Sequence, residues 1–184
     1  YHFSNDILVH LGQSSNTSYK HNKKDIEFIK ELKKLNFLHY IYISSTKIYE
    51  KSNTNKKIKN YINFKLTSEQ NFDLSKSTIL RCCNIYGLSQ KKPTLLSSIV
   101  NQIQKNNFVK LDNLSNKIEY LWIDDLINLI LKVIKMKKSG IFNVTSKKKY
   151  SVKEICNKII KLKKKNNIKL DEKKINIAKA INIK

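Results

Sequence analysis

The chain has 184 residues, enough for one domain of ordinary size or a large part of a bigger protein. Hydrophobic residues make up 40% of it, which is sufficient for a core, and no apolar run approaches the ~18 residues that a membrane span needs. Its three cysteines form neither a disulfide framework nor a zinc-binding spacing, and no secretory signal is visible. We therefore expect a cytoplasmic protein with no membrane segment and no metal site.

The formal net charge of +23 points towards a nucleic-acid partner. Of the 37 basic residues, however, only Arg81 is an arginine, and the lysines are spread over helix faces and loops. Recognition of phosphates and bases usually recruits arginine for its bidentate guanidinium. The chain is also rich in Asn and Ile, the pattern expected from an AT-rich genome. We therefore expect no nucleic-acid partner, and we keep a lysine-rich nucleic-acid-binding protein as a second alternative.

In the first part of the chain, apolar strands alternate with amphipathic helices. We expect strands at 7–11, 38–43 and 78–82 and helices at 23–34 and 61–72. The strand at 38–43 is continuously apolar, which is typical of the centre of a parallel sheet. Alternating strands and helices predict a βαβ arrangement.

The pattern changes after Gly87. The expected elements are a helix after Pro93, strands at 108–111 and 118–122, a helix from Asp124 through Met136, a strand at 141–144, a helix at 152–162 and a weakly helical tail at 166–184. Ser151 and Glu154 have the spacing of a capping box. Asp124 and Asp125 are expected to stabilise the positive end of their helix rather than to act in catalysis.

A cluster of hydroxyl groups follows the central strand. Ser44, Ser45 and Thr46 lie where open α/β sheets bind ligands, and Tyr61 and Lys65 share one face of the next helix. A phenol has an unperturbed pKa of about 10, and a lysine charge beside it favours the phenolate. A hydroxyl, a phenol and an ammonium at one point would form a proton-transfer site.

The tyrosine–lysine spacing alone is not specific. One of the 37 basic residues is arginine, which leaves 36 lysines among 184 positions, and the chain has nine tyrosines. A tyrosine followed by a lysine four residues later is then expected about 1.8 times by chance. Two pairs occur, and Tyr19 with Lys23 is the other one. Only Tyr61 follows an apolar strand with a hydroxyl cluster at its end, so this context selects Tyr61 and Lys65.

Glycine is rare in this sequence. Gly12, Gly87 and Gly140 are far apart, whereas a Gly-rich phosphate loop needs several glycines within a few residues. The sequence also begins at Tyr1, directly before a strand. We therefore expect a fragment that lacks such a loop.

Six segments in order resemble motifs of the extended short-chain dehydrogenase/reductase family, in its NAD-dependent epimerase/dehydratase branch that acts on nucleotide sugars. They are residues 6–12, 42–49, 61–69, 79–87, 122–125 and 140–152. The most specific is Tyr61-Ile-Asn-Phe-Lys65 with its trailing Glu69, which resembles the Tyr-x-x-x-Lys helix. The family's Gly-rich loop lies in its first βαβ units, before the part that this chain resembles.

The resemblance implies an α/β fold: the C-terminal half of a Rossmann-type, doubly wound parallel sheet with a small α/β substrate-binding lobe. Residues 1–92 would be the remaining part of the NAD(P)-binding domain. Residues 93–184 would be the mixed substrate-binding lobe, with Rossmann elements returning at about 118–146.

The resemblance also implies a role for each candidate residue. Tyr61 would be the general acid/base as hydride passes to or from the nicotinamide, Lys65 would hold the nicotinamide ribose, and Thr46 would orient the reacting oxygen. The implied contacts with NAD or NADP are Leu11, Gly12, Gln13, Asn22, Thr46, Tyr61, Lys65 and Cys83. The implied contacts with a nucleotide-sugar substrate are Thr46 and Asn84.

Some positions depart from the family pattern. Ile118 stands where the family often has a diphosphate-binding arginine, and Glu50 replaces the usual glycine. Asn84 is equally well explained as a turn residue. A non-catalytic NAD(P)-binding or regulatory protein on the same scaffold is therefore the first alternative. The resemblance further implies a homodimer through the helices at 23–34 and 61–72.

Overall fold

The computed structural model describes residues 3–11, 19–50, 55–88, 94–105, 108–111, 113–163, 169–171 and 175–176. The chain divides into two compact units. Unit 1 comprises Tyr1–Cys83 and Ile123–Thr145, and unit 2 comprises Asn84–Trp122 and Ser146–Lys184. We expected a division near residue 92 with elements of about 118–146 returning to the first part. The units change at Cys83 and Asn84, and the chain returns to unit 1 over Ile123–Thr145.

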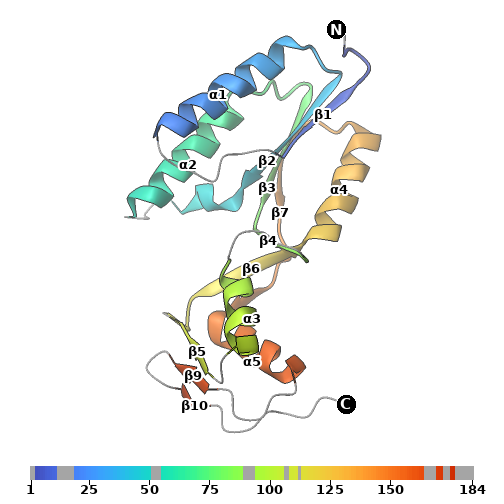
Figure 1. Cartoon of the computed structure of the whole chain (residues 1–184). Coiled ribbons are helices and arrows are strands. Elements are labelled where there is room, and N and C mark those ends of the chain that lie inside the picture. Colours follow the sequence, from blue (N-terminus) through green and yellow to red (C-terminus); the bar gives the residue numbers. More distant parts are fainter. Residues whose placement is uncertain are drawn as a thin grey trace. The chain divides into compact units, whose positions relative to one another are not determined.

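Unit 1 is a parallel sheet with helices on both faces. Its elements are β1 (Ile7–His10), α1 (Tyr19–Lys34), β2 (His39–Ser45), the 3-10 helix η1 (Thr46–Tyr49), α2 (Lys56–Glu69), β3 (Ser77–Cys82), α4 (Ile123–Met136) and β7 (Gly140–Val144). The strand order is β1-β2-β3-β7, and every neighbouring pair is parallel. Helices α1 and α2 cover one face and α4 covers the other (Figure 1). The predicted α/β arrangement is confirmed.

The centre of this sheet is built from β2 and β3. Tyr42 on β2 is 2% exposed and stacks on Phe72 with 4.9 Å between the ring centroids, and Ile79 on β3 belongs to the same buried cluster. The parallel register places Ser44 beside Arg81 and Ser45 beside Cys82. The hydroxyl groups that end β2 therefore lie at the carboxyl edge of the sheet, where such folds bind ligands.

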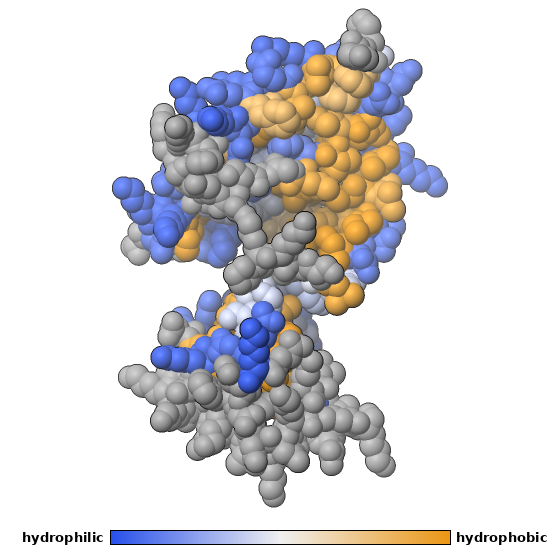
Figure 2. All heavy atoms as spheres, viewed as in Figure 1, coloured by the Kyte–Doolittle hydropathy of each residue, from blue (hydrophilic) through white to orange (hydrophobic). Residues whose placement is uncertain are grey.

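Helix α4 is apolar over more of its circumference than unit 1 covers. Leu126 and Val133 are buried, whereas Ile127 and Leu131 are 46% and 57% exposed. Apolar side chains gather on the α4 side of unit 1 (Figure 2).

Strand β1, at one edge of the described sheet, has the sequence Ile-Leu-Val-His and carries none of the charged residues that usually protect an edge. Neither α4 nor any other helix among the described residues is long and apolar enough to cross a membrane.

Unit 2 holds two small sheets and two helices. Its elements are β4 (Asn84–Tyr86), α3 (Leu95–Lys105), β5 (Phe108–Lys110), β6 (Lys117–Trp122), β8 (Lys149–Ser151), α5 (Val152–Lys163), β9 (Lys169–Asp171) and β10 (Ile175–Asn176). The strand orders are β4-β6-β8 and β10-β9-β5. Its core is formed by the apolar faces of α3 and α5 around Ile103, Val109 and Cys156, each 0% exposed.

The structure corrects several expected elements. Helix α2 begins at Lys56, five residues before the expected start at Tyr61. The expectation of a helical tail is wrong where the tail is described, because β9 and β10 lie there. Strands β4 and β8 were not expected at all. Each has three residues, too few to show a period, and each forms by pairing with β6.

The predicted capping box at the start of α5 is confirmed. The Glu154 amide donates to the Ser151 hydroxyl oxygen at 3.1 Å, and the Glu154 carboxylate accepts from the Ser151 amide at 2.7 Å. We expect Ser151→Ala to lower the free energy of unfolding by about 1 kcal/mol. The substitution removes the hydroxyl oxygen that accepts from the Glu154 amide, one of the amides at the start of a helix that have no partner within the helix. Urea unfolding checks this, with the exposed Ser115→Ala as the control; equal effects of the two substitutions would contradict it.

Candidate active site

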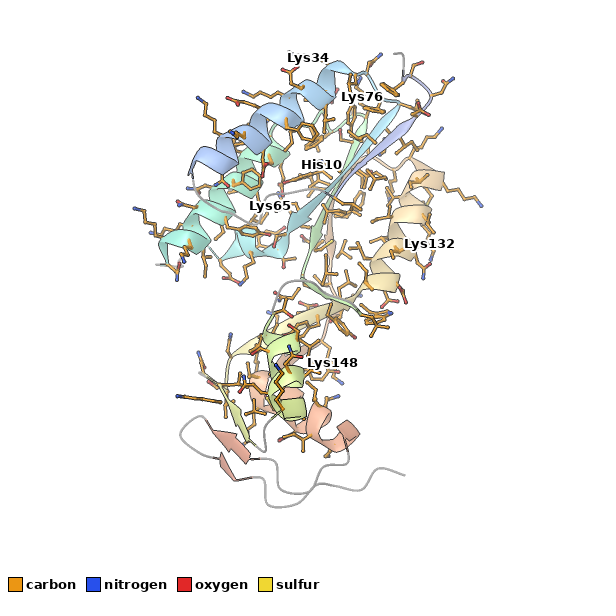
Figure 3. The ribbon with its side chains drawn as sticks, viewed as in Figure 1. His10, Lys34, Lys65, Lys76, Lys132 and Lys148 are labelled. Atoms are coloured by element: carbon orange, nitrogen blue, oxygen red, sulfur yellow. The ribbon has the colours of Figure 1, made fainter. Side chains whose placement is uncertain are left out.

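Tyr61 and Lys65 lie on the face of α2 that meets β2. Lys65 is only 5% exposed and points from α2 towards the strands (Figure 3). Its Nζ donates to the Ile43 carbonyl oxygen at 2.8 Å and to the Tyr42 hydroxyl at 3.4 Å. The same Nζ lies 5.9 Å from the centroid of the Tyr61 ring. The structure therefore brings the predicted phenol and ammonium together at the end of β2.

A second hydroxyl near Tyr61 belongs to Ser45, and it acts to lower the pKa of the phenol. The Ser45 side chain accepts a hydrogen bond from the Lys47 amide at 3.2 Å. Thr46 is the first residue of η1, and its hydroxyl donates to the Cys82 carbonyl oxygen at 3.5 Å. Sequence reasoning chose Thr46, and that choice stays a prediction. Strand β2 continues through Ser45 and η1 begins at Thr46, so both hydroxyls lie at the end of this strand.

Lys65 is a cation held in an unusually dry place. Burial lowers its pKa to about 8, and the negative charge of Glu69 limits that shift. The ammonium is therefore still the main form at pH 7. It has three N–H donors, and two hydrogen-bond acceptors are described for it. One donor is left for a ligand.

The environment of Tyr61 differs from the sequence-based expectation in one respect. We expected the lysine charge to lower the pKa of the phenol, but burial raises it, and the nearby Ser45 hydroxyl only partly opposes that effect. The reason is geometric, because the Lys65 ammonium is turned towards the Ile43 carbonyl. In this state Tyr61 is a neutral phenol that can donate a proton.

The implied cofactor contacts are only partly described. Leu11 follows β1 and is 64% exposed, while Gly12 and Gln13 lie outside the described residues. Asn22 lines a hollow of about 350 Å³ between α1 and α2, and neither Tyr61 nor Lys65 lines that hollow.

Cys83 and Asn84 lie on opposite sides of the boundary between the units. Cys83 is 8% exposed, and its amide donates to the Val144 carbonyl oxygen at 3.1 Å in unit 1. Asn84 is exposed at the start of β4, and its side chain donates to the Glu119 carbonyl oxygen at 3.1 Å in unit 2. Asn84 is therefore a strand residue rather than a turn residue. Its side-chain nitrogen is the donor in that bond, so the carboxamide oxygen takes no part in it.

A sequence model of the NAD dependent epimerase/dehydratase family matches residues 4–145. No curated protein sequence matches the chain significantly. Several solved structures share its fold. UDP-N-acetylglucosamine 4-epimerase from Bacillus cereus is 22% identical with a TM-score of 0.71, and the match covers 84% of this chain and 61% of that one.

Two further structures agree. UDP-glucuronic acid 4-epimerase from Bacillus cereus in complex with NAD is 17% identical with a TM-score of 0.70, over 88% of this chain and 61% of that one. dTDP-glucose 4,6-dehydratase from Bacillus anthracis in complex with NAD is 19% identical with a TM-score of 0.69, over 96% and 63%. This chain thus spans about three fifths of these proteins' length. Because the family match covers most of its 184 residues, the chain belongs to the NAD dependent epimerase/dehydratase family.

Proposed function

We propose that this chain carries the proton-transfer site of an NAD(P)-dependent nucleotide-sugar epimerase, dehydratase or reductase. The observation that carries the proposal is the Lys65 ammonium, which lies 5.9 Å from the centroid of the Tyr61 ring and is held by the Ile43 carbonyl oxygen at the carboxyl edge of the sheet. Family membership supports the reaction class. The similar structures are of proteins named for UDP- and dTDP-linked sugars, which supports the substrate class.

The residues present fit one end of the cofactor. Lys65 has a donor left for a ribose hydroxyl, and Tyr61 lies next to it, as the nicotinamide end of NAD or NADP requires. The pyrophosphate end is different, since the sequence has three isolated glycines and no Gly-rich loop. We propose that further polypeptide supplies this loop and packs on the apolar α4 side of unit 1, and that the 184 residues alone bind the cofactor weakly.

The chain's own residues would divide the proton chemistry as follows. When bound, the nicotinamide accepts or donates a hydride. Tyr61 donates a proton from its phenolic oxygen to the reacting sugar oxygen, or takes one back in the reverse direction. The Ser45 hydroxyl, which lies near Tyr61, would orient that phenol. The Lys65 ammonium stabilises negative charge that develops on the Tyr61 oxygen during transfer.

A homodimer is a further part of the proposal. Helices α1 and α2 lie against each other on one face of the sheet. Phe28 on α1 is 55% exposed and Leu66 on α2 is 37% exposed. A second copy that covered these two helices would bury both side chains.

The experiment is a conversion assay on the full-length enzyme. The protein is incubated with NAD or NADP and with UDP-N-acetylglucosamine, UDP-glucuronic acid or dTDP-glucose, and the sugar products are identified by NMR. Conversion of any of these supports the proposal. Cofactor binding without conversion of any nucleotide sugar would favour the non-catalytic alternative. Salt-sensitive binding of DNA or RNA would favour the nucleic-acid alternative.

Ser45 and Thr46 make different predictions for turnover. We expect Ser45→Ala to lower turnover by about 10- to 100-fold, because Tyr61 loses the hydroxyl that orients it. Thr46→Val should change turnover by less than about threefold if Thr46 only bonds the Cys82 carbonyl oxygen. Both are measured at saturating substrate, and a larger effect at Thr46 than at Ser45 would restore Thr46 as the catalytic hydroxyl.

A further inference from the structure

The only arginine of the chain lies at the carboxyl edge of the unit 1 sheet. Arg81 on β3 donates through Nε and Nη2 to the Glu69 carboxylate, with Nη2 2.6 Å from Oε2. Its Nη1 donates to the Tyr49 hydroxyl at 2.9 Å. The side chains of Glu69 and Arg81 are 6% and 17% exposed. These contacts form a network that is buried at Glu69 and exposed at Tyr49, which we call the Glu69–Arg81 clamp.

The clamp connects most elements that meet at this edge. Glu69 is the last residue of α2, and its Oε1 accepts from the Ser44 hydroxyl on β2. Tyr49 is the last residue of η1, and its hydroxyl donates to Asn143 Oδ1 on β7 at 2.8 Å. The clamp thus joins α2, β2, η1, β3 and β7 within unit 1.

These contacts surround the candidate active site. Glu69 follows Lys65 by four residues, so the two lie on one face of α2. Ser44 directly precedes Ser45, and Tyr49 closes the turn that follows it. The position of Ser45 relative to Tyr61 therefore depends on a strand end and a helix that the clamp holds together.

Lysine could not make these contacts. A guanidinium offers five donors in a rigid fork that matches both oxygens of a carboxylate, whereas an ammonium is a point charge on a flexible stem. Apart from the four histidines, every other basic residue of this chain is a lysine. The one arginine stands where a single side chain must bond a buried carboxylate and a tyrosine hydroxyl at once.

We propose that Glu69 and Arg81 are positioning residues that hold Ser45, Tyr61 and Lys65 in their mutual orientation, and that the guanidinium of Arg81 is specifically required for this. The inference rests on the proposed function for its catalytic meaning. The positioning itself is a property of the protein without ligand, so it can be tested apart from turnover.

The test follows the Lys65 side chain directly. Lysine amines are labelled with 13C by reductive methylation and titrated by NMR, where the low pKa of Lys65 separates its signal from those of other lysines, and Lys65→Arg assigns it. Arg81→Lys keeps the net charge, so a purely electrostatic effect is nearly absent. We expect the Lys65 midpoint in Arg81→Lys to move by about half a pH unit or more, since its environment is no longer fixed. The control Glu31→Gln removes a carboxylate from an exposed pair with Lys34 and should leave the midpoint unchanged.

A double variant separates positioning from stability. Removing one partner of a buried pair strongly destabilises a protein, whereas replacing both by apolar residues is often neutral. Glu69→Leu/Arg81→Met should therefore unfold near the wild-type temperature. Because the Glu69 charge itself acts on the pKa of Lys65, positioning is measured in this variant from turnover and not from the Lys65 midpoint. In the active full-length enzyme it should lower kcat about tenfold or more, with a smaller change in KM.

The outcomes are distinct. An unchanged Lys65 midpoint in Arg81→Lys together with wild-type kcat in the double variant would overturn the proposal and make the clamp purely structural. An unchanged Lys65 midpoint in Arg81→Lys with a lowered kcat in the double variant would overturn only the requirement for a guanidinium. If the enzyme converts no nucleotide sugar, the proposed function fails, but the NMR titration still tests the clamp.

Discussion

Tyr61→Phe should lower turnover of the full-length enzyme by about 10²- to 10⁴-fold, the range for loss of a positioned acid/base. The substitution removes only the phenolic oxygen and keeps the ring against α2 and β2. Because Tyr61 is a neutral phenol whose burial raises its pKa, the lost function is proton donation to the sugar oxygen. The measurement is kcat with the best nucleotide sugar, alongside the free energy of unfolding.

The chain offers a matched control for that substitution. Tyr19 is also followed by a lysine four residues later, but no hydroxyl-rich strand end precedes it. Tyr19→Phe should leave turnover unchanged. Similar losses at both positions, or turnover within tenfold of wild type in Tyr61→Phe, would remove Tyr61 from the proton-transfer step.

Much of unit 1 could be predicted from the sequence because its signals are local. The continuous apolar run before Ser44 identifies a central strand, and the spacing of Tyr61 and Lys65 places both on one helix face. The hydroxyl cluster then distinguishes this pair from the chance pair at Tyr19. All of these signals lie within one strand–helix unit, so no long-range contact had to be guessed.

The remaining features depend on contacts between distant residues. Strand β2 ends at Ser45, two residues beyond the expected end at residue 43, and hydropathy does not resolve this boundary between the hydroxyl residues. Glu69 was noted as part of a motif and Arg81 as the single arginine, but nothing in the sequence joined them. The direction of the Tyr61 pKa also depends on burial by the whole fold, which outweighs a charge one helical turn away.

Buried histidine makes the protein sensitive to acid. His39 on β2 is 2% exposed, and its Nε2 lies 2.7 Å from the Thr78 hydroxyl oxygen. Thr78 donates its only proton to the Lys138 carbonyl oxygen at 2.7 Å, so Nε2 of His39 must carry a proton and donate it to Thr78. Burial lowers the pKa of His39, and the nearby Lys137 lowers it further. His10 behaves similarly, since burial and then Lys65 lower its pKa against the opposing charge of Asp25.

We therefore expect the free energy of unfolding to fall as the pH drops below about 6.5, the ordinary pKa of an unfolded histidine. Below that pH the histidine binds a proton in the unfolded chain but not in the folded chain, because its pKa is lower in the folded chain. The contribution of the neutral histidine to the free energy of unfolding is therefore complete above pH 6.5 and is lost on acidification. The slope is at most about 1.4 kcal/mol per pH unit for each such histidine. Urea unfolding between pH 7.5 and pH 5 measures it. His39→Gln replaces the imidazole by an amide that does not titrate. The slope of the unfolding free energy against pH should then decrease by up to the contribution of one bound proton. A slope equal to that of wild type would show that protonation of His39 does not cause the loss of stability in acid.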